Sequence, residues 1–509
     1  MELKPNTVSR PAQAERRSVL TTIIFVLFFA ALVGEWYVEF DPVMYLGRWR
    51  SPFVAFAPLF APLPMISLSL WQLLLIALAP ICITAFRARP ERSRELDRTI
   101  FISIACIAVT FLWGLIRGGS PYYAYYQVWR FLTALLLAYL LMSVVRTPRD
   151  LATLAKLVVL AALIRATLCI YFYWTYLYGK VDPMPEFVTN HDDSILFVAA
   201  TLIIGISVFV KGGKAAWMTA LLVVPFVFYA MVLNDRRIAW VELALAVPAI
   251  YVLMGPSPLR SRINRWLVLA APLLIVYAAV GWGREGALFA PLQAFSSAGS
   301  NYDPSSLTRQ EEIRNLLYTL TAIGNPFFGT GWGVPYIRME HYWSNYAADW
   351  TLVLYTPHNS LLGLAVFSGL VGLIGIWGVI PMAAFLAARG YRRSTELIPR
   401  GGAMVAVGCL AAYTVHTYGD VGLSSFMCNI IFGAALGTAG KIAAWSEALP
   451  ATQPAAPPAG ARRMAPQPRP TFRNTGATRT RLDSSSELPR PASGSDFGMK
   501  PGRAPRLPR

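Results

Sequence analysis

The sequence predicts an all-α integral membrane protein with about twelve transmembrane helices and one large polar loop. Of its 509 residues, 55% are hydrophobic and only 14% are charged, whereas soluble domains usually carry about 25% charged residues. The apolar residues recur in runs long enough to cross the hydrocarbon core of a bilayer as helices. Lys and Arg gather in alternate connections between these runs, as expected when those connections face the cytoplasm.

The predicted spans follow one another through most of the chain. A polar N-terminal segment, residues 1–17, precedes a polytopic membrane domain at 18–446. The expected spans are about 19–40, a second ending near 86, a third ending near 116, 128–145, 151–178, two that flank 211–214, an eighth from about 237, a ninth ending near 282, 360–388, and two separated by 418–422. Twelve spans with their basic connections inside place both termini in the cytoplasm.

A polar insert at 284–356 interrupts the apolar spans between the ninth and the tenth, on the predicted outer side. It contains a short expected helix, 306–323, and a turn-rich run, 324–333, and it leads into the sequence Tyr355-Thr356-Pro357-His358-Asn359-Ser360. Such an insert is either a large connecting loop or a working site. We interpret it as the site.

The C-terminal segment, residues 447–509, is rich in Pro, Arg, Ala, Ser and Gly. This composition predicts a disordered cytoplasmic tail. A dispensable tail is the simpler interpretation, and attraction to anionic membrane lipid is the alternative. Because much of the +18 net charge lies in this tail and in cytoplasmic loops, it does not indicate a nucleic-acid partner.

His358 is the candidate general base. Proline disfavours helix for the residue before it and suits the first helical turn, so Pro357 places His358 where the chain enters the tenth span. A half-dry, rigidly held histidine suits proton transfer near neutral pH. Asn359 is positioned to orient the imidazole or a substrate hydroxyl, and an interfacial histidine that caps a helix is the structural alternative.

Four arginines on the outer side are candidates for binding phosphate. Arg236 and Arg237 open the eighth span, and Arg309 and Arg314 lie on the expected helix of the insert. Guanidinium groups bind phosphate oxygens through two parallel hydrogen bonds. Membrane-interface anchors and a solvated helix face are the corresponding structural interpretations.

Two charged residues fall inside predicted spans, Arg165 in the fifth and Glu242 in the eighth. Charges at such positions need a partner or a wet cavity. They either pair with each other, or Arg165 forms the floor of a substrate cavity that opens outward.

The sequence gives no metal site. The run His191-Asp192-Asp193 lies on an outer loop, but the sequence places no second group of ligands beside it, so loop decoration is the favoured interpretation. The five cysteines fall within apolar runs, and no pair has metal-ligand spacing. We therefore expect neither a metal nor a cofactor.

Several short motifs over about residues 100–440 resemble the O-antigen ligase family, which includes related polysaccharide polymerases. Its Arg-x-Ala-aromatic pattern matches 237–240, with Arg236 in place of the usual Ser. Its Pro-x-x-Gly-x-Gly turn matches 326–331, and its His-Asn-Ser motif matches 358–360. The upstream family arginine matches Arg309 best, but Ile313 stands where an aromatic residue is expected, so the assignment can slip to Arg314.

The resemblance implies a metal-independent, inverting glycosyltransferase of the C-type membrane fold in the bacterial inner membrane, with its site facing the periplasm. The donor would be a glycan on undecaprenyl diphosphate, and the acceptor lipid A-core or another glycan chain. By this analogy His358 deprotonates the acceptor, and Arg237, with Arg236 and Arg309, holds the diphosphate. Polymerase and ligase share these motifs. A flippase or transporter and a non-catalytic scaffold are alternatives of other classes.

Overall fold

The computed structural model describes residues 19–34, 70–86, 93–180, 188–189, 192–284, 286–296, 304–339 and 354–448. The chain divides into two units, Met1–Ala451 and Thr452–Arg509, and every described residue belongs to the first. The predictions for the N-terminal segment and for the tail beyond residue 448 lie outside the described residues. So do His191 and His341.

Ten helices of the described chain are long and apolar enough to cross a membrane. They identify an all-α, multi-pass membrane protein. Two shorter apolar helices, Val19–Gly34 and Trp71–Thr84, stand where the first two spans are predicted. Twelve spans therefore stays a prediction, while the all-helical class is confirmed over the residues that the structure describes.

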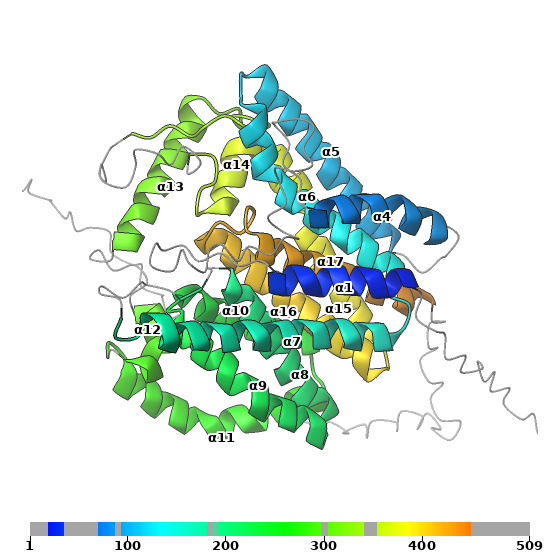
Figure 1. Ribbon diagram of the computed structural model, residues 1–509, viewed down its shortest axis with the longest axis vertical. Coiled ribbons are helices and arrows are strands. Elements are labelled where there is room, and N and C mark those ends of the chain that lie inside the picture. The colour runs from blue at the N-terminus through cyan, green and yellow to red at the C-terminus, as the bar shows by residue number, and fades with distance from the viewer. Residues whose placement is uncertain are drawn as a thin grey trace, which may run out of the picture. The chain divides into compact units, whose positions relative to one another are not determined.

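The helices are labelled as in Figure 1. In chain order they are α1 (Val19–Gly34), α4 (Leu70–Phe86), α5 (Arg94–Ile116), α6 (Pro121–Val144), α7 (Pro148–Phe172), α8 (Asp193–Lys211), α9 (Lys214–Leu233), α10 (Arg237–Met254), α11 (Pro258–Gly281), α12 (Ala290–Ser296), α13 (Pro304–Ala322), α14 (Ser360–Val371), α15 (Val379–Arg393), α16 (Leu397–Gly419) and α17 (Phe426–Ala448). Helix α13 confirms the short helix predicted within the insert.

Local sequence explains where several of these helices begin. Ser93 accepts a hydrogen bond from the N–H of Leu96 at the start of α5. Thr147 and Asp150 form a reciprocal capping box at the start of α7. Such side chains satisfy backbone N–H groups that have no partner within the helix. Helices α5 and α7 therefore start at a polar side chain that caps them.

Helix α17 forms the centre of the bundle. Its membrane-crossing window is entirely buried, and it packs against α6, α8, α15 and α16 (Figure 1). Helix α11 is the opposite case, because no residue of its membrane-crossing window is buried although it is strongly apolar. An apolar helix that its own protein does not cover is suited to contact lipid.

The connections between the helices gather at two ends of the bundle, as their predicted alternation requires. At the end that holds the insert, which we call the insert end, the Ser360 hydroxyl donates to the carbonyl of Asp420 at 3.2 Å. At the other end, which we call the basic end, Arg389 pairs with Glu95 and Glu447. The described connecting residues at the insert end include 117–120, 178–180, 188–189, 234–236, 282–284, 323–339, 354–359 and 420–425.

A glycine-rich loop of the insert, residues 325–333, inserts into a break in α14. The helix is interrupted at Gly369, whose φ is 57°. Before the break, the carbonyl of Val366 accepts from the N–H of Thr330 at 2.7 Å. After the break, the N–H of Leu370 donates to the carbonyl of Pro326 at 3.0 Å. Two neighbouring bonds follow the same pattern, from the Gly331 N–H to the Phe367 carbonyl and from the Val371 N–H to the Phe327 carbonyl. The loop thus satisfies the backbone groups that the break exposes.

The same loop packs against the backbone of α5. A Cβ on Gly331 would lie 2.2 Å from the Cα of Gly114, and Gly331 has a φ of 89°. Trp332 donates from its indole nitrogen to the hydroxyl of Thr110 at 2.8 Å. Only glycine combines this approach with this backbone conformation. Because the loop joins α13 to the start of α14, it fixes the two elements that build the site.

Candidate functional site

His358 lies at the insert end of α14, as the sequence predicts. Its neighbour Asn359 is the N-cap of the helix and accepts from the N–H of Leu362 at 2.9 Å. Pro357 is buried, while the His358 side chain is 39% exposed. The histidine is therefore held by the helix start and remains accessible.

Glu312 of α13 holds both His358 and Asn359. The His358 Nδ1 and the Glu312 Oε2 are 2.9 Å apart, and the Asn359 backbone N–H donates to Glu312 Oε1 at 3.0 Å. Glu312 is only 5% exposed. With Nδ1 donating to the carboxylate, Nε2 is the nitrogen that can act on a ligand. A carboxylate that fixes the tautomer of a histidine in this way is a common support for a general base.

The charges around His358 shift its proton affinity. The hydrogen bond with Glu312 is the largest influence and raises the pKa of His358 above its usual 6.5, while burial acts in the opposite direction. The negative charge of Asp420 raises this pKa further, and the positive charge of Arg309 lowers it. Arg309 and Asp420 thus lie within electrostatic reach of the imidazole.

Arg309 and Arg314 occupy different positions relative to His358. Both are exposed on α13, but Arg309 lies one turn before Glu312 and acts on the histidine. Arg314 is not among the described groups that shift the pKa of His358. Of the two arginines, Arg309 is therefore the one whose charge acts on the imidazole.

Arg236 and Arg237 lie at the insert end of α10. Arg236 is the N-cap and half-buried, and Arg237 is the first helical residue and exposed. Ile238 packs closely against Gly419. A Cβ added to Gly419 would lie 3.0 Å from the Cδ1 of Ile238. Because Gly419 directly precedes Asp420, the arginine pair shares the insert end with His358.

Arg165 belongs to a separate ion pair. Its Nε lies 2.5 Å from Asp193 Oδ1, and both side chains are buried. Glu242 accepts instead from His416, with 2.6 Å between Oε1 and Nδ1. The predicted pairing of Arg165 with Glu242 is therefore wrong. The structure does not bring Arg165 to His358, because it is held by Asp193 within the helix bundle.

One further prediction needs correction, and two residues have to be added to the site. Asp192 and Asp193 are buried, so loop decoration is wrong for them. The sequence interpretation gave no role to Glu312, which binds His358 directly, or to Asp420, whose negative charge raises the pKa of His358. Two sequence features could have indicated them. Glu312 is a carboxylate three residues after Arg309 on the predicted helix, and Asp420 is a carboxylate in the short turn between the last two spans.

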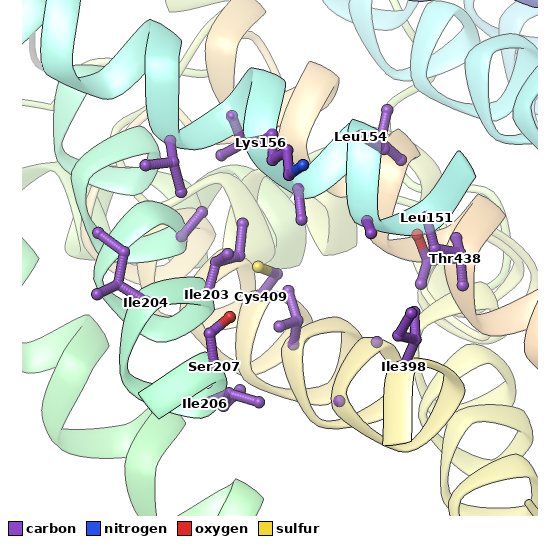
Figure 2. Close-up of a pocket in the computed structure, with 18 of the residues that line it drawn as sticks. Leu151, Leu154, Lys156, Ile203, Ile204, Ile206, Ser207, Ile398, Cys409 and Thr438 are labelled. Carbon is purple, nitrogen blue, oxygen red and sulfur yellow. The ribbon is translucent and has the colours of Figure 1, made fainter. Parts of the chain in front are cut away.

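A cavity of about 500 Å³ lies away from this site, between α7, α8, α9, α16 and α17. Figure 2 shows Lys156 among apolar side chains such as Ile203 and Leu154. Its lining residues from α7, α8, α9 and α16 lie mainly toward the basic end, and those from α17 lie between Ile431 and Thr438, in the first half and middle of that helix. An apolar cavity in a membrane-crossing region is suited to a hydrocarbon chain rather than to proton transfer.

No protein-family model matches the chain, and a search of curated proteins gives no match. The site is therefore defined by its geometry. It consists of His358, its carboxylate partner Glu312, and the charges of Arg309 and Asp420, with the Arg236–Arg237 pair at the same end of the bundle.

Proposed function

We propose that this protein is a metal-independent, inverting glycosyltransferase of the O-antigen ligase kind. It would transfer a glycan from undecaprenyl diphosphate to a sugar hydroxyl on lipid A-core, at the periplasmic face of a bacterial inner membrane. The observation that carries the proposal is the accessible His358 whose Nδ1 is bound to the buried carboxylate of Glu312, with Arg309 within electrostatic reach.

In this proposal His358 Nε2 takes the proton from the acceptor hydroxyl as that oxygen attacks the anomeric carbon. The imidazolium that forms is stabilised by Glu312, which accepts from Nδ1. Glu312 raises the pKa of His358, so the imidazole is a stronger base than an isolated one. A positioned base of this kind contributes roughly 10²- to 10⁴-fold to a rate.

The arginines at the insert end supply the positive charge that a diphosphate leaving group requires. Bidentate guanidinium contacts stabilise the charge that develops as the bond to the leaving group breaks. Arg309 is near the base, and Arg237 is exposed at the start of α10. A single displacement with the base on one side and the leaving group on the other inverts the anomeric carbon.

A polymerase that joins repeat units would use the same base and arginines, so it is the alternative within this class. A polysaccharide flippase is the alternative of another class. What favours an enzyme over it is that the two charged residues singled out inside predicted spans, Arg165 and Glu242, each have a buried partner.

Deletion of the gene in the source organism distinguishes these functions through the surface glycan on a gel. Loss of a ligase leaves bare lipid-core, with polymer retained on the carrier lipid. Loss of a polymerase leaves single repeats on the core, and loss of a flippase leaves neither product outside. Normal surface glycan in the deletion strain would contradict all three.

A further inference from the structure

A second cluster of ionisable side chains lies in the interior at the insert end. Asp192 precedes α8, His416 is in the last turn of α16, and Cys428 is in the first turn of α17. One ligand atom from each lies within 4.8 Å of the others, and all three side chains are buried. We propose that Asp192, His416 and Cys428 form a site for a zinc-type divalent metal ion.

The orientation of His416 points to a ligand. Its Nδ1 is bound to Glu242 Oε1 at 2.6 Å. Its Nε2 is buried, and no atom of the described residues meets hydrogen-bond geometry with it, although Cys428 lies beside the ring. Histidines that bind metal through one nitrogen usually donate from the other to a carboxylate, which fixes the ring and its tautomer. Glu242 has that supporting role here, and Nε2 is the metal ligand.

The donor set selects the kind of metal. A thiolate, an imidazole and a carboxylate suit zinc and related transition metals, whereas magnesium and calcium prefer oxygen ligands. Ligand atoms of a tetrahedral zinc site lie about 3.4–3.6 Å apart, so the three groups reach a shared ion by shifts of about 1 Å. A water molecule would complete the coordination.

The charge balance of the cluster favours a cation. The carboxylates of Glu242 and Asp192 and the thiol of Cys428 surround one imidazole in the buried interior. A divalent ion balances the charges of its two anionic ligands, the Cys428 thiolate and the Asp192 carboxylate, while the Glu242 carboxylate keeps its hydrogen bond with His416 Nδ1. Each buried charge of the cluster then has a partner, as charges within a membrane protein require.

Metal at this site would join the insert ends of α8, α16 and α17. The backbone N–H of Asp420 donates to the carbonyl of His416 at 2.7 Å, so the ion would also fix the turn that carries Asp420. The residues come from positions 192, 416 and 428, which is why cysteine spacing could not reveal the site. The inference does not depend on the proposed glycosyl transfer.

Metal content and cobalt absorption of the purified full-length protein test the proposal. The wild type, after exposure to Zn²⁺ and removal of unbound metal, is expected to retain about one equivalent. Co²⁺ in its place should give a thiolate-to-cobalt charge-transfer band. Glu242→Gln should weaken metal binding roughly 10- to 100-fold, as loss of a supporting carboxylate does.

Cys428→Ser and Asp192→Asn should lose the bound metal, and Cys428→Ser should lose the cobalt band. Cys409→Ser is the matched control, because Cys409 is buried in the same helix as His416 but lies outside the cluster. A folded wild type without stoichiometric metal or a cobalt band overturns the proposal. Equal metal binding by Cys428→Ser and Cys409→Ser would also overturn it. If Cys428→Ser does not fold, the presence or absence of the cobalt band in the wild type decides the question.

Discussion

Replacing Glu312 by Gln tests the role of the carboxylate behind His358. The substitution keeps the shape of the side chain but removes the charge that the Nδ1 hydrogen bond uses. A hydrogen bond to a charged partner contributes about 1.5–3 kcal/mol, and each 1.4 kcal/mol changes a rate about tenfold. Since the His358 side chain is 39% exposed, solvent screening places the expected loss of turnover at the lower end, about 10- to 30-fold.

The pH dependence of transfer separates this role from a general loss of structure. Glu312 raises the pKa of His358, and a base works only when deprotonated, so activity falls as the pH drops through that pKa. Removing the carboxylate lowers the pKa. The acidic limb of the kcat/KM profile should therefore move to lower pH in Glu312→Gln, measured with purified protein in nanodiscs.

Glu311→Gln is the matched control, because Glu311 is the adjacent residue on α13 and is not among the groups that act on His358. It should keep turnover within about twofold of the wild type and leave the acidic limb in place. The reasoning is refuted if Glu312→Gln and Glu311→Gln behave alike, or if the limb does not move when turnover falls.

Three further predictions concern the arginines, the glycine loop and metal independence. Arg237→Ala should weaken binding of the carrier-lipid donor, and Arg237→Lys should restore that binding poorly. Arg309→Ala should reduce transfer more than Arg314→Ala does. Equal losses at these two positions would contradict the role assigned to Arg309. Gly331→Ala should lower the free energy of unfolding by about 2–4 kcal/mol, because the new Cβ would lie 2.2 Å from the Gly114 backbone at a φ of 89°. Gly205→Ala is the control and should not lower it, because a Cβ there meets no atom within 4 Å. Transfer should continue in excess EDTA, and a loss that Mg²⁺ or Mn²⁺ reverses would count against the arginine model, since these ions do not suit a thiolate-containing cluster.

The sequence predicts those features that depend on local pattern. Apolar length locates the ten candidate spans, and the alternation of basic loops is matched by connections that meet at two ends. Pro357 and the capping side chain of Asn359 place His358 at the start of a helix, as observed. Each of these features follows from residues within a few positions of one another, or from the length of an apolar run.

Features that depend on distant residues could not be predicted in this way. The contact between Glu312 and His358 joins positions 46 residues apart, and it depends on how α13 packs beside α14. The partner of Arg165 was misassigned for the same reason, because Asp193 reaches it from the start of the following helix. Periodicity states which face of a helix is apolar but not which buried charge lies opposite.

The break in α14 shows a second limit of local pattern. Gly369 lies in an apolar run that predicts a continuous helix, and glycine alone does not require an interruption. The break is stable because the loop at 325–333 supplies the hydrogen bonds that the helix loses. That exchange involves backbone groups, which leave little trace in side-chain chemistry.

Single-turnover transfer by purified His358→Ala tests the central claim most directly. Wild-type protein, His358→Ala and His341→Ala are compared in nanodiscs with a glycan on undecaprenyl diphosphate and a lipid A-core acceptor, and donor binding is measured separately. We expect His358→Ala to bind the donor and to transfer it roughly 10²- to 10⁴-fold more slowly. His341 is the control, because it lies in the same insert but not at the start of a predicted span, so His341→Ala should remain close to the wild type. Near-normal transfer by a folded His358→Ala, or absence of transfer by the wild type, would contradict the account.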